Sequence, residues 1–212
     1  MSISYTRQLE IISVISGIFP IAAALLNFRH LNGVLKIISA LFVFSFIIDV
    51  GLWIALENGT KNDMYVIHIY IIISLIFYAI IYHKLFEKII LKNLTIILSC
   101  IVAIIMFIYN RNLQQYPSVS NTSLSVLLII LSLLYFYQLL NPQKFIHIEK
   151  LGLFWINAGI LFYSAVNIFL FMLLDRIPRA EQHNYYMIHS VTNIIANILY
   201  SIGLLCKQQK TS

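Results

Sequence analysis

Residues 33–56 read GVLKIISALFVFSFIIDVGLWIAL, and this stretch decides the fold. It is longer than the roughly 20 apolar residues that an α-helix needs to cross the hydrocarbon core of a bilayer. Six more stretches of similar length and character fill most of the chain, and the links between them are short and polar. We therefore predict seven membrane-spanning helices, at roughly 8–28, 33–56, 64–86, 89–109, 120–141, 151–175 and 185–206.

The composition excludes a water-soluble fold. Hydrophobic residues make up 60% of the chain and charged residues 10%, whereas soluble domains carry about 25% charged residues. No link between the expected spans is long enough to hold a second domain. The prediction is one all-α domain over residues 1–212, a polytopic seven-transmembrane-helix bundle in a lipid bilayer.

The basic residues predict an orientation. The formal net charge is +6, and the lysines and arginines lie at span ends and in links, as topology and lipid headgroups require, rather than in a nucleic-acid-binding surface. Nine fall on the side of the C-terminus: Arg29, Lys36, Lys84, Lys88, Lys92, Lys144, Lys150, Lys207 and Lys210. Five fall on the other side: Arg7, Lys61, Arg111, Arg176 and Arg179. Because cytoplasmic loops are enriched in basic residues, we expect a cytoplasmic C-terminus and an external N-terminus in a cell membrane, with the bacterial inner membrane as the expected location.

Asp49 is the one acidic residue that falls deep inside an expected span. An aspartate at the centre of a membrane helix costs about 2.5–3.5 kcal/mol on insertion scales, so its side chain should face the bundle interior. Other polar residues lie at a comparable depth in the outer halves of the third, sixth and seventh spans. We predict an outer-half ligand-binding pocket lined by Asp49, Trp53, His68, Asn167, His189 and Asn193.

Two polar stripes support an inward orientation. On the seventh span, steps of four, four and three residues connect His189, Asn193, Asn197 and Tyr200. On the sixth span the stripe consists of Asn157, Ser164 and Asn167. Lipid offers no partner to an amide, so both stripes should face other helices. They serve either as hydrogen bonds between helices or as part of a binding site.

The same residues leave two cofactors open. An aspartate and two histidines can bind zinc and leave one position for water, so Asp49, His68 and His189 are candidate metal ligands of an intramembrane metal-dependent lipid hydrolase. Two histidines at matched depth could instead hold a haem. Neither histidine belongs to a His-x-x-x-His pair and we assign no catalytic residue, so the pattern favours a protein that is not an enzyme.

Three stretches carry a resemblance to a known group of proteins: 68–70 (HIY), 154–163 (FWINAGILFY) and 188–190 (IHS), the last leading into Asn193. The chain resembles a group of small, uncharacterised seven-helix membrane proteins of bacteria, some of them encoded near sensor histidine kinases. That group often has a glutamate one turn after the tyrosine of the third span, where Ser74 stands here. The resemblance implies a sensor or receptor-like protein that signals through a membrane or cytoplasmic partner. A structural or defence-associated membrane subunit is the further alternative.

Overall fold

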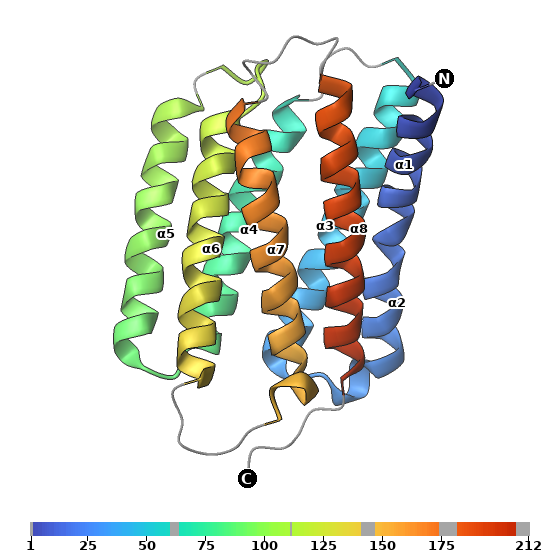
Figure 1. Cartoon of the computed structure of the whole chain (residues 1–212). Coiled ribbons are helices and arrows are strands. Elements are labelled where there is room, and N and C mark those ends of the chain that lie inside the picture. Colours follow the sequence, from blue (N-terminus) through green and yellow to red (C-terminus); the bar gives the residue numbers. More distant parts are fainter. Residues whose placement is uncertain (1, 60–63, 111, 141–146, 174–181, 207–212) are drawn as a thin grey trace.

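The computed structural model describes residues 2–59, 64–110, 112–140, 147–173 and 182–206 (Figure 1). Over these ranges the chain forms helices joined by short links, and the expected all-α seven-helix bundle is confirmed. The helices are α1 (Ser2–Ser16), α2 (Ile18–Asn27), α3 (Gly33–Glu57), α4 (Met64–Leu85), α5 (Ile89–Tyr109), α6 (Ser118–Leu140), α7 (Gly152–Leu173) and α8 (Gln182–Leu205). Two short 3-10 turns, η1 (Phe28–His30) and η2 (Ile148–Lys150), follow α2 and precede α7.

Seven segments are long and apolar enough to cross a membrane: Tyr5–His30, Gly33–Ala55, Met64–Leu85, Ile89–Tyr109, Ser118–Leu140, Gly152–Met172 and Tyr185–Leu205. These segments agree with the predicted spans to within a few residues at each end. The predicted ends at residues 141 and 175 lie outside the described residues. So do several basic residues on which the orientation depends, namely Lys61, Arg111, Lys144, Arg176, Arg179, Lys207 and Lys210.

The first span consists of two helices, α1 and α2, that meet at Gly17. The backbone N–H of Gly17 donates to the carbonyl of Val14, which is a tighter bond than the regular helical one. Pro20 has no N–H to continue the ladder across this point. A Cβ atom at Gly17 would lie 2.9 Å from the ring of Phe46, so the absence of a side chain lets α3 approach closely here.

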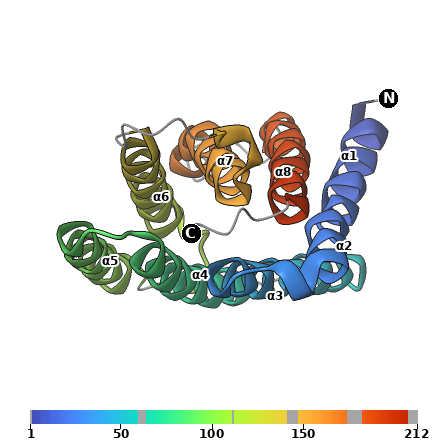
Figure 2. The same ribbon diagram turned by 90° about the horizontal axis from the view of Figure 1, so that it is seen from below.

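The helices close into a ring. Each helix from α3 to α7 packs against the next one in the chain, and α1 and α2 pack against both α8 and α3. Seen along the bundle axis, α3, α4 and α5 form one row and α6, α7 and α8 a second row (Figure 2). The two rows face each other, so residues of α3 and α4 can share a site with residues of α7 and α8.

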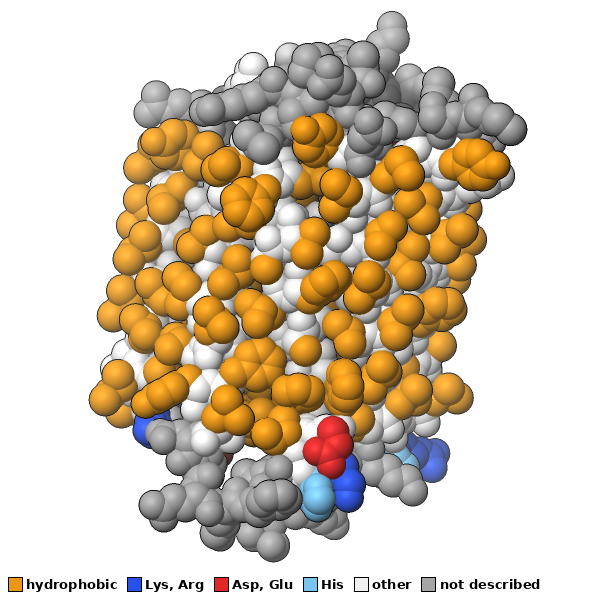
Figure 3. Space-filling model, viewed as in Figure 1, with side chains coloured by type: hydrophobic (Ala, Val, Ile, Leu, Met, Phe, Trp, Pro, Cys, Tyr) orange, Lys and Arg blue, Asp and Glu red, His pale blue; other side chains and the backbone are white. Residues whose placement is uncertain are grey.

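The face of the bundle seen in Figure 3 is mostly apolar along the described helices, as a bilayer environment requires. In this view, charged side chains of the described residues lie at the lower end of the bundle, where α3 begins. At the opposite end, where α1 begins and α3 ends, Arg7 donates to Glu57 at 2.5 Å. We call the end that holds Arg7 and Glu57 the outer end, following the orientation that the sequence predicts.

The closest helix contact is between α7 and α8. Gly152 and Gly203 meet backbone to backbone, so a Cβ atom at Gly203 would lie 2.6 Å from the carbonyl oxygen of Gly152. Further along, a Cβ atom at Gly159 would lie 2.6 Å from the ring of Tyr200. Small residues at such contacts let membrane helices gain dispersion energy that bulkier side chains would prevent.

Candidate functional site

Asp49 points into the bundle. An α-helix turns by about 100° per residue, so the side chain of Asp49 points within about 40° of the directions of Leu35, Ile38 and Phe42. All three of these side chains are buried. Ile47 points about 160° away from Asp49 on the same helix and is 61% exposed on the lateral surface. The inward orientation expected for the only deep acid therefore agrees with the geometry of α3.

Although it faces inward, Asp49 is exposed to water-sized molecules. Protein surrounds its carboxyl group, which lies within electrostatic range of Tyr70 and Tyr163. At a rise of 1.5 Å per residue, it sits about 12 Å below the outer end of α3. An inward-facing residue that stays accessible at this depth means that the helices do not seal the outer half of the bundle.

The wall of this space on the α4 side is aromatic. The hydroxyl groups of Tyr70 and Ser45 lie 3.1 Å apart and share a hydrogen bond, which ties α4 to α3 one turn below Asp49. The ring of Tyr70 stacks on Phe44, with 6.0 Å between the ring centroids. This packing fixes the phenol beside the carboxyl group.

The opposite wall is built by α7 and α8. The side-chain amide of Asn167 donates to the backbone carbonyl of Tyr163, so its oxygen is left to accept from Nδ1 of His189 at 2.9 Å. The imidazole ring also packs edge-on against Tyr163 and lies beside Phe171, with centroid separations of 5.8 and 6.0 Å. Asn167 thus sets the tautomer of His189, with the hydrogen on Nδ1 and a lone pair on Nε2.

Both His189 and Tyr163 are half-buried although each lies on the inward face of its helix. In the described part of the chain, Nε2 of His189 and the hydroxyl group of Tyr163 have no hydrogen-bond partner, and neither atom is sealed from water. Both atoms therefore keep some accessible surface. We define the outer pocket as the space lined by Asp49, Tyr70, Tyr163 and His189. Asn167, which was predicted to line it, is fully buried and holds His189 from behind.

Trp53 shares the inward face of α3 with Asp49, one turn nearer the outer end. Its side chain is 38% exposed. Together with the accessible carboxyl group, this position places the indole at the outer mouth of the pocket.

The structure places His68 elsewhere. Its side chain is buried, and Nε2 contacts the backbone carbonyl of Gln115 at 3.1 Å, in the link between α5 and α6. Its Nδ1 atom is buried with no partner among the described residues. His68 therefore holds this link against α4 and has no contact with the outer pocket in the described hydrogen-bond network.

Asn193 and Asn197 also turn away from the outer pocket. The amide of Asn193 donates to Ser13 at 3.0 Å, and that of Asn197 donates to Ser16 at 2.8 Å. Both bonds join α8 to α1. These two asparagines act between helices, which is one of the two roles that the polar stripe allowed.

A metal centre is not supported by the described side chains. Among the residues that the structure describes, no three His, Cys, Asp or Glu side chains gather closely enough to hold an ion. Asp49, His68 and His189 are all described, and they do not form such a group. The bis-histidine haem also loses its geometric basis, because His68 is engaged at Gln115 while His189 faces Asn167.

The described side chains of the inner half of the bundle pack closely together. Tyr82 is fully buried, donates to the side-chain oxygen of Asn157 and bonds Ser132, each at 2.8 Å, so it joins α4, α6 and α7. Phe42 and Tyr200 stack across α3 and α8 with 4.5 Å between their centroids. The outer pocket therefore has a packed floor.

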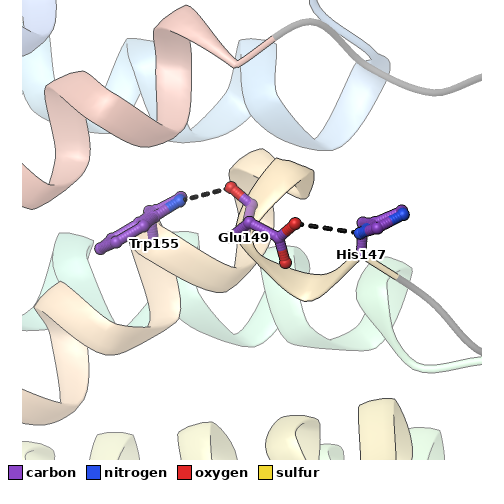
Figure 4. A network of polar contacts seen from close by, with 3 residues as sticks. All are labelled: His147, Glu149 and Trp155. Carbon is purple, nitrogen blue, oxygen red and sulfur yellow. Dashed lines mark hydrogen bonds and ion pairs between the residues drawn. The ribbon is translucent and has the colours of Figure 1, made fainter.

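Beyond this floor, a polar cluster lies at the start of α7, at the inner end of the bundle (Figure 4). The indole of Trp155 donates to the backbone carbonyl of Glu149 at 2.8 Å, and His147 lies 3.1 Å from the Glu149 carboxylate. A hydrogen bond from its own backbone N–H, assisted by His147, lowers the pKa of Glu149 below its usual value. One helix, α7, thus connects the outer pocket to this cluster.

Sequence reasoning did not assign Tyr163, Tyr70 or Ser45 to the site. Tyr163 stands four residues before Asn167, and this spacing on one helix face was the available signal. Comparisons with protein families, with curated proteins and with solved structures find no match to this chain. The case for a function therefore depends on the geometry of the outer pocket.

Proposed function

We propose that this protein is an integral membrane receptor or sensor whose outer pocket takes a small ligand from the outer side. The observation that carries the proposal is Asp49, an inward-facing acid that stays accessible about 12 Å inside the bundle. No ion pair or hydrogen bond to a described residue offsets the cost of placing this group in the membrane. Intramembrane acids of this kind mark functional sites.

The closed inner half supports a receptor rather than a pore. A ligand that binds against Tyr163 pushes on α7, and α7 is packed tightly against α8 at its glycine contacts. A tightly packed helix transmits a displacement because packed interfaces switch between discrete arrangements rather than deform smoothly. The signal would reach a partner at Trp155, near the inner end of α7, and at Glu149 in the preceding turn η2.

The proposal includes an orientation and an output. With the C-terminus in the cytoplasm, the polar cluster around Glu149 and the basic residues near it face a membrane or cytoplasmic signalling partner. A metal-dependent lipid hydrolase is less favoured, since no described group of three ligands exists. A structural subunit explains the bonds from Asn193 and Asn197 to α1, but leaves the accessible acid without a role.

The first test is access of water to the pocket. In a background with Cys100→Ser and Cys206→Ser, we compare Asp49→Cys with Ile47→Cys, which lies at the same depth on the lipid-facing side of α3. A membrane-impermeant thiol reagent added from the N-terminal side of reconstituted vesicles should label the cysteine at 49 and spare the one at 47. Equal labelling, or labelling of neither, contradicts the outer pocket.

The second test is transmission to the inner end. The chain has two tryptophans, so Trp53→Phe leaves Trp155 as the only reporter. Attaching a cationic thiol reagent to Asp49→Cys should shift the emission of Trp155, because the label occupies the pocket that α7 lines. An unchanged emission after complete labelling would remove the receptor role while leaving the pocket.

A further inference from the structure

The accessible polar atoms of the outer pocket can attract a positive charge. Asp49 brings a carboxylate, and His189 brings the lone pair of Nε2, since Asn167 has taken the hydrogen on Nδ1. No lysine or arginine occurs in the outer halves of α3, α4, α7 or α8, so nothing on these walls would neutralise an anion. The pocket therefore selects a cation.

The walls distinguish an organic cation from an inorganic one. Tyr70 and Tyr163 lie within electrostatic range of Asp49, and aromatic ring faces attract ammonium groups as well as apolar surface. Calcium and magnesium need six or more oxygen ligands, whereas Asp49 is the one carboxylate on this level of the bundle. An ion that keeps its water shell would gain little from the tyrosine rings, but an ammonium with a hydrocarbon body gains from both.

Tyr163 connects the two polar groups of the pocket. It lies within electrostatic range of Asp49 and packs edge-on against His189. A molecule with its ammonium at Asp49 can lie along Tyr163 and place a second hydrogen-bond donor at Nε2 of His189. Charge-assisted bonds of the first kind are the stronger of the two contacts.

We propose that the outer pocket binds an organic ammonium ion, with the charged nitrogen at Asp49 between Tyr70 and Tyr163 and a distal donor at His189. This inference rests on the proposed receptor function and names the ligand class of the same pocket. Trp53, one turn above Asp49 on the same face of α3, reports occupancy.

The experiment uses the full-length chain in lipid nanodiscs, with Trp155→Phe so that Trp53 is the only fluorophore. The probes are 2-phenylethylammonium, its 4-hydroxy derivative, the neutral 2-phenylethanol, sodium and magnesium. We expect saturable quenching or shift of Trp53 emission by the two ammonium ions. The neutral alcohol should bind at least about tenfold more weakly, as loss of a charge-assisted bond implies.

Matched variants separate the two contacts. Asp49→Asn should weaken both ammonium probes at least about tenfold, whereas Glu57→Gln, which removes another acid of α3 outside the pocket, should leave both affinities unchanged. The 4-hydroxy probe should bind more tightly than the parent, and His189→Leu should abolish only this advantage. Size exclusion and melting temperature show whether each variant is folded.

Each other outcome overturns the inference. Binding that is equal for the alcohol and the ammonium, or unchanged in Asp49→Asn, contradicts an ammonium site. Saturation by sodium or magnesium in place of the organic probes makes the site inorganic. If Trp53 emission does not respond up to millimolar probe while the cysteine in Asp49→Cys is still labelled by aqueous reagents, the ligand class is rejected and the proposed receptor pocket is not. If that cysteine is not labelled either, the pocket itself is rejected.

Discussion

Replacing Gly203 by alanine tests the packing of α7 on α8, the helix pair that builds one wall of the pocket. The added Cβ atom would lie 2.6 Å from the carbonyl oxygen of Gly152 and 2.7 Å from Cγ1 of Ile156. Ordinary contact begins at 3.4 Å, so the helices must separate by up to 0.8 Å at this point. The obstacle is backbone and cannot rotate away.

A gap of this size forfeits a quarter to a half of the dispersion energy of each facing atom pair. Overpacking of this kind costs about 1–3 kcal/mol. Alanine also stabilises a helix by about 1 kcal/mol relative to glycine, and this gain offsets part of the destabilisation. Gly51→Ala supplies the control, because a Cβ atom there meets nothing within 4 Å and gains the propensity alone.

We therefore expect Gly203→Ala to be less stable than Gly51→Ala by about 1–3 kcal/mol. The assay is unfolding in mixed micelles of a mild detergent and SDS, followed by emission of Trp155 with Trp53→Phe in both proteins. Equal stability of the two variants would refute the backbone contact of α7 and α8 on which the wall depends.

Two further outcomes follow from the polar contacts of the inner half. Tyr82→Phe leaves the buried oxygen of Asn157 without its donor and should cost about 0.6–1.7 kcal/mol in the same micelle assay; an unchanged midpoint would contradict the network. Because the pKa of Glu149 is lowered in the folded protein, its charged carboxylate stabilises the turn η2 at any pH above the ordinary carboxyl pKa. This stabilisation is lost as the pH falls through the lowered pKa. Emission of Trp155 should therefore titrate on the acid side with Glu149 present and become flat there in Glu149→Gln, and identical acid limbs would show that the carboxylate has no part in the cluster.

The fold could be predicted because each span is long, apolar and bounded by polar links, and bilayer thickness leaves few alternatives for such segments. The inward orientation of Asp49 followed from the cost of a charge in lipid. These arguments concern one helix and its surroundings, and they need no knowledge of which helices are neighbours.

The partners of the polar residues could not be predicted in the same way. On α8, His189, Asn193 and Asn197 span about 80° of the helix circumference. This arc is wide enough for His189 to face α7 while the two asparagines face α1. A stripe shows that residues avoid lipid, but the ring order of the helices decides what each one contacts. His68 was predicted to line the pocket only because of its depth along the third span. Its contact with Gln115 depends on the conformation of the link between α5 and α6, which helical periodicity cannot predict.

The contrast between the two halves of the bundle favours binding over conduction. The outer half leaves Asp49 accessible, whereas Leu35, Ile156 and Leu204 at the inner end are fully buried. Opening a path through this floor would require Tyr82 to leave both of its hydrogen-bond partners. Polar groups freed in the membrane interior find no substitute in lipid, so the described arrangement is held closed by the same bonds that join α4 to α6 and α7. Under the proposed function, a ligand at Asp49 would therefore act on the inner end through movement of the helices and would need no route through the bundle.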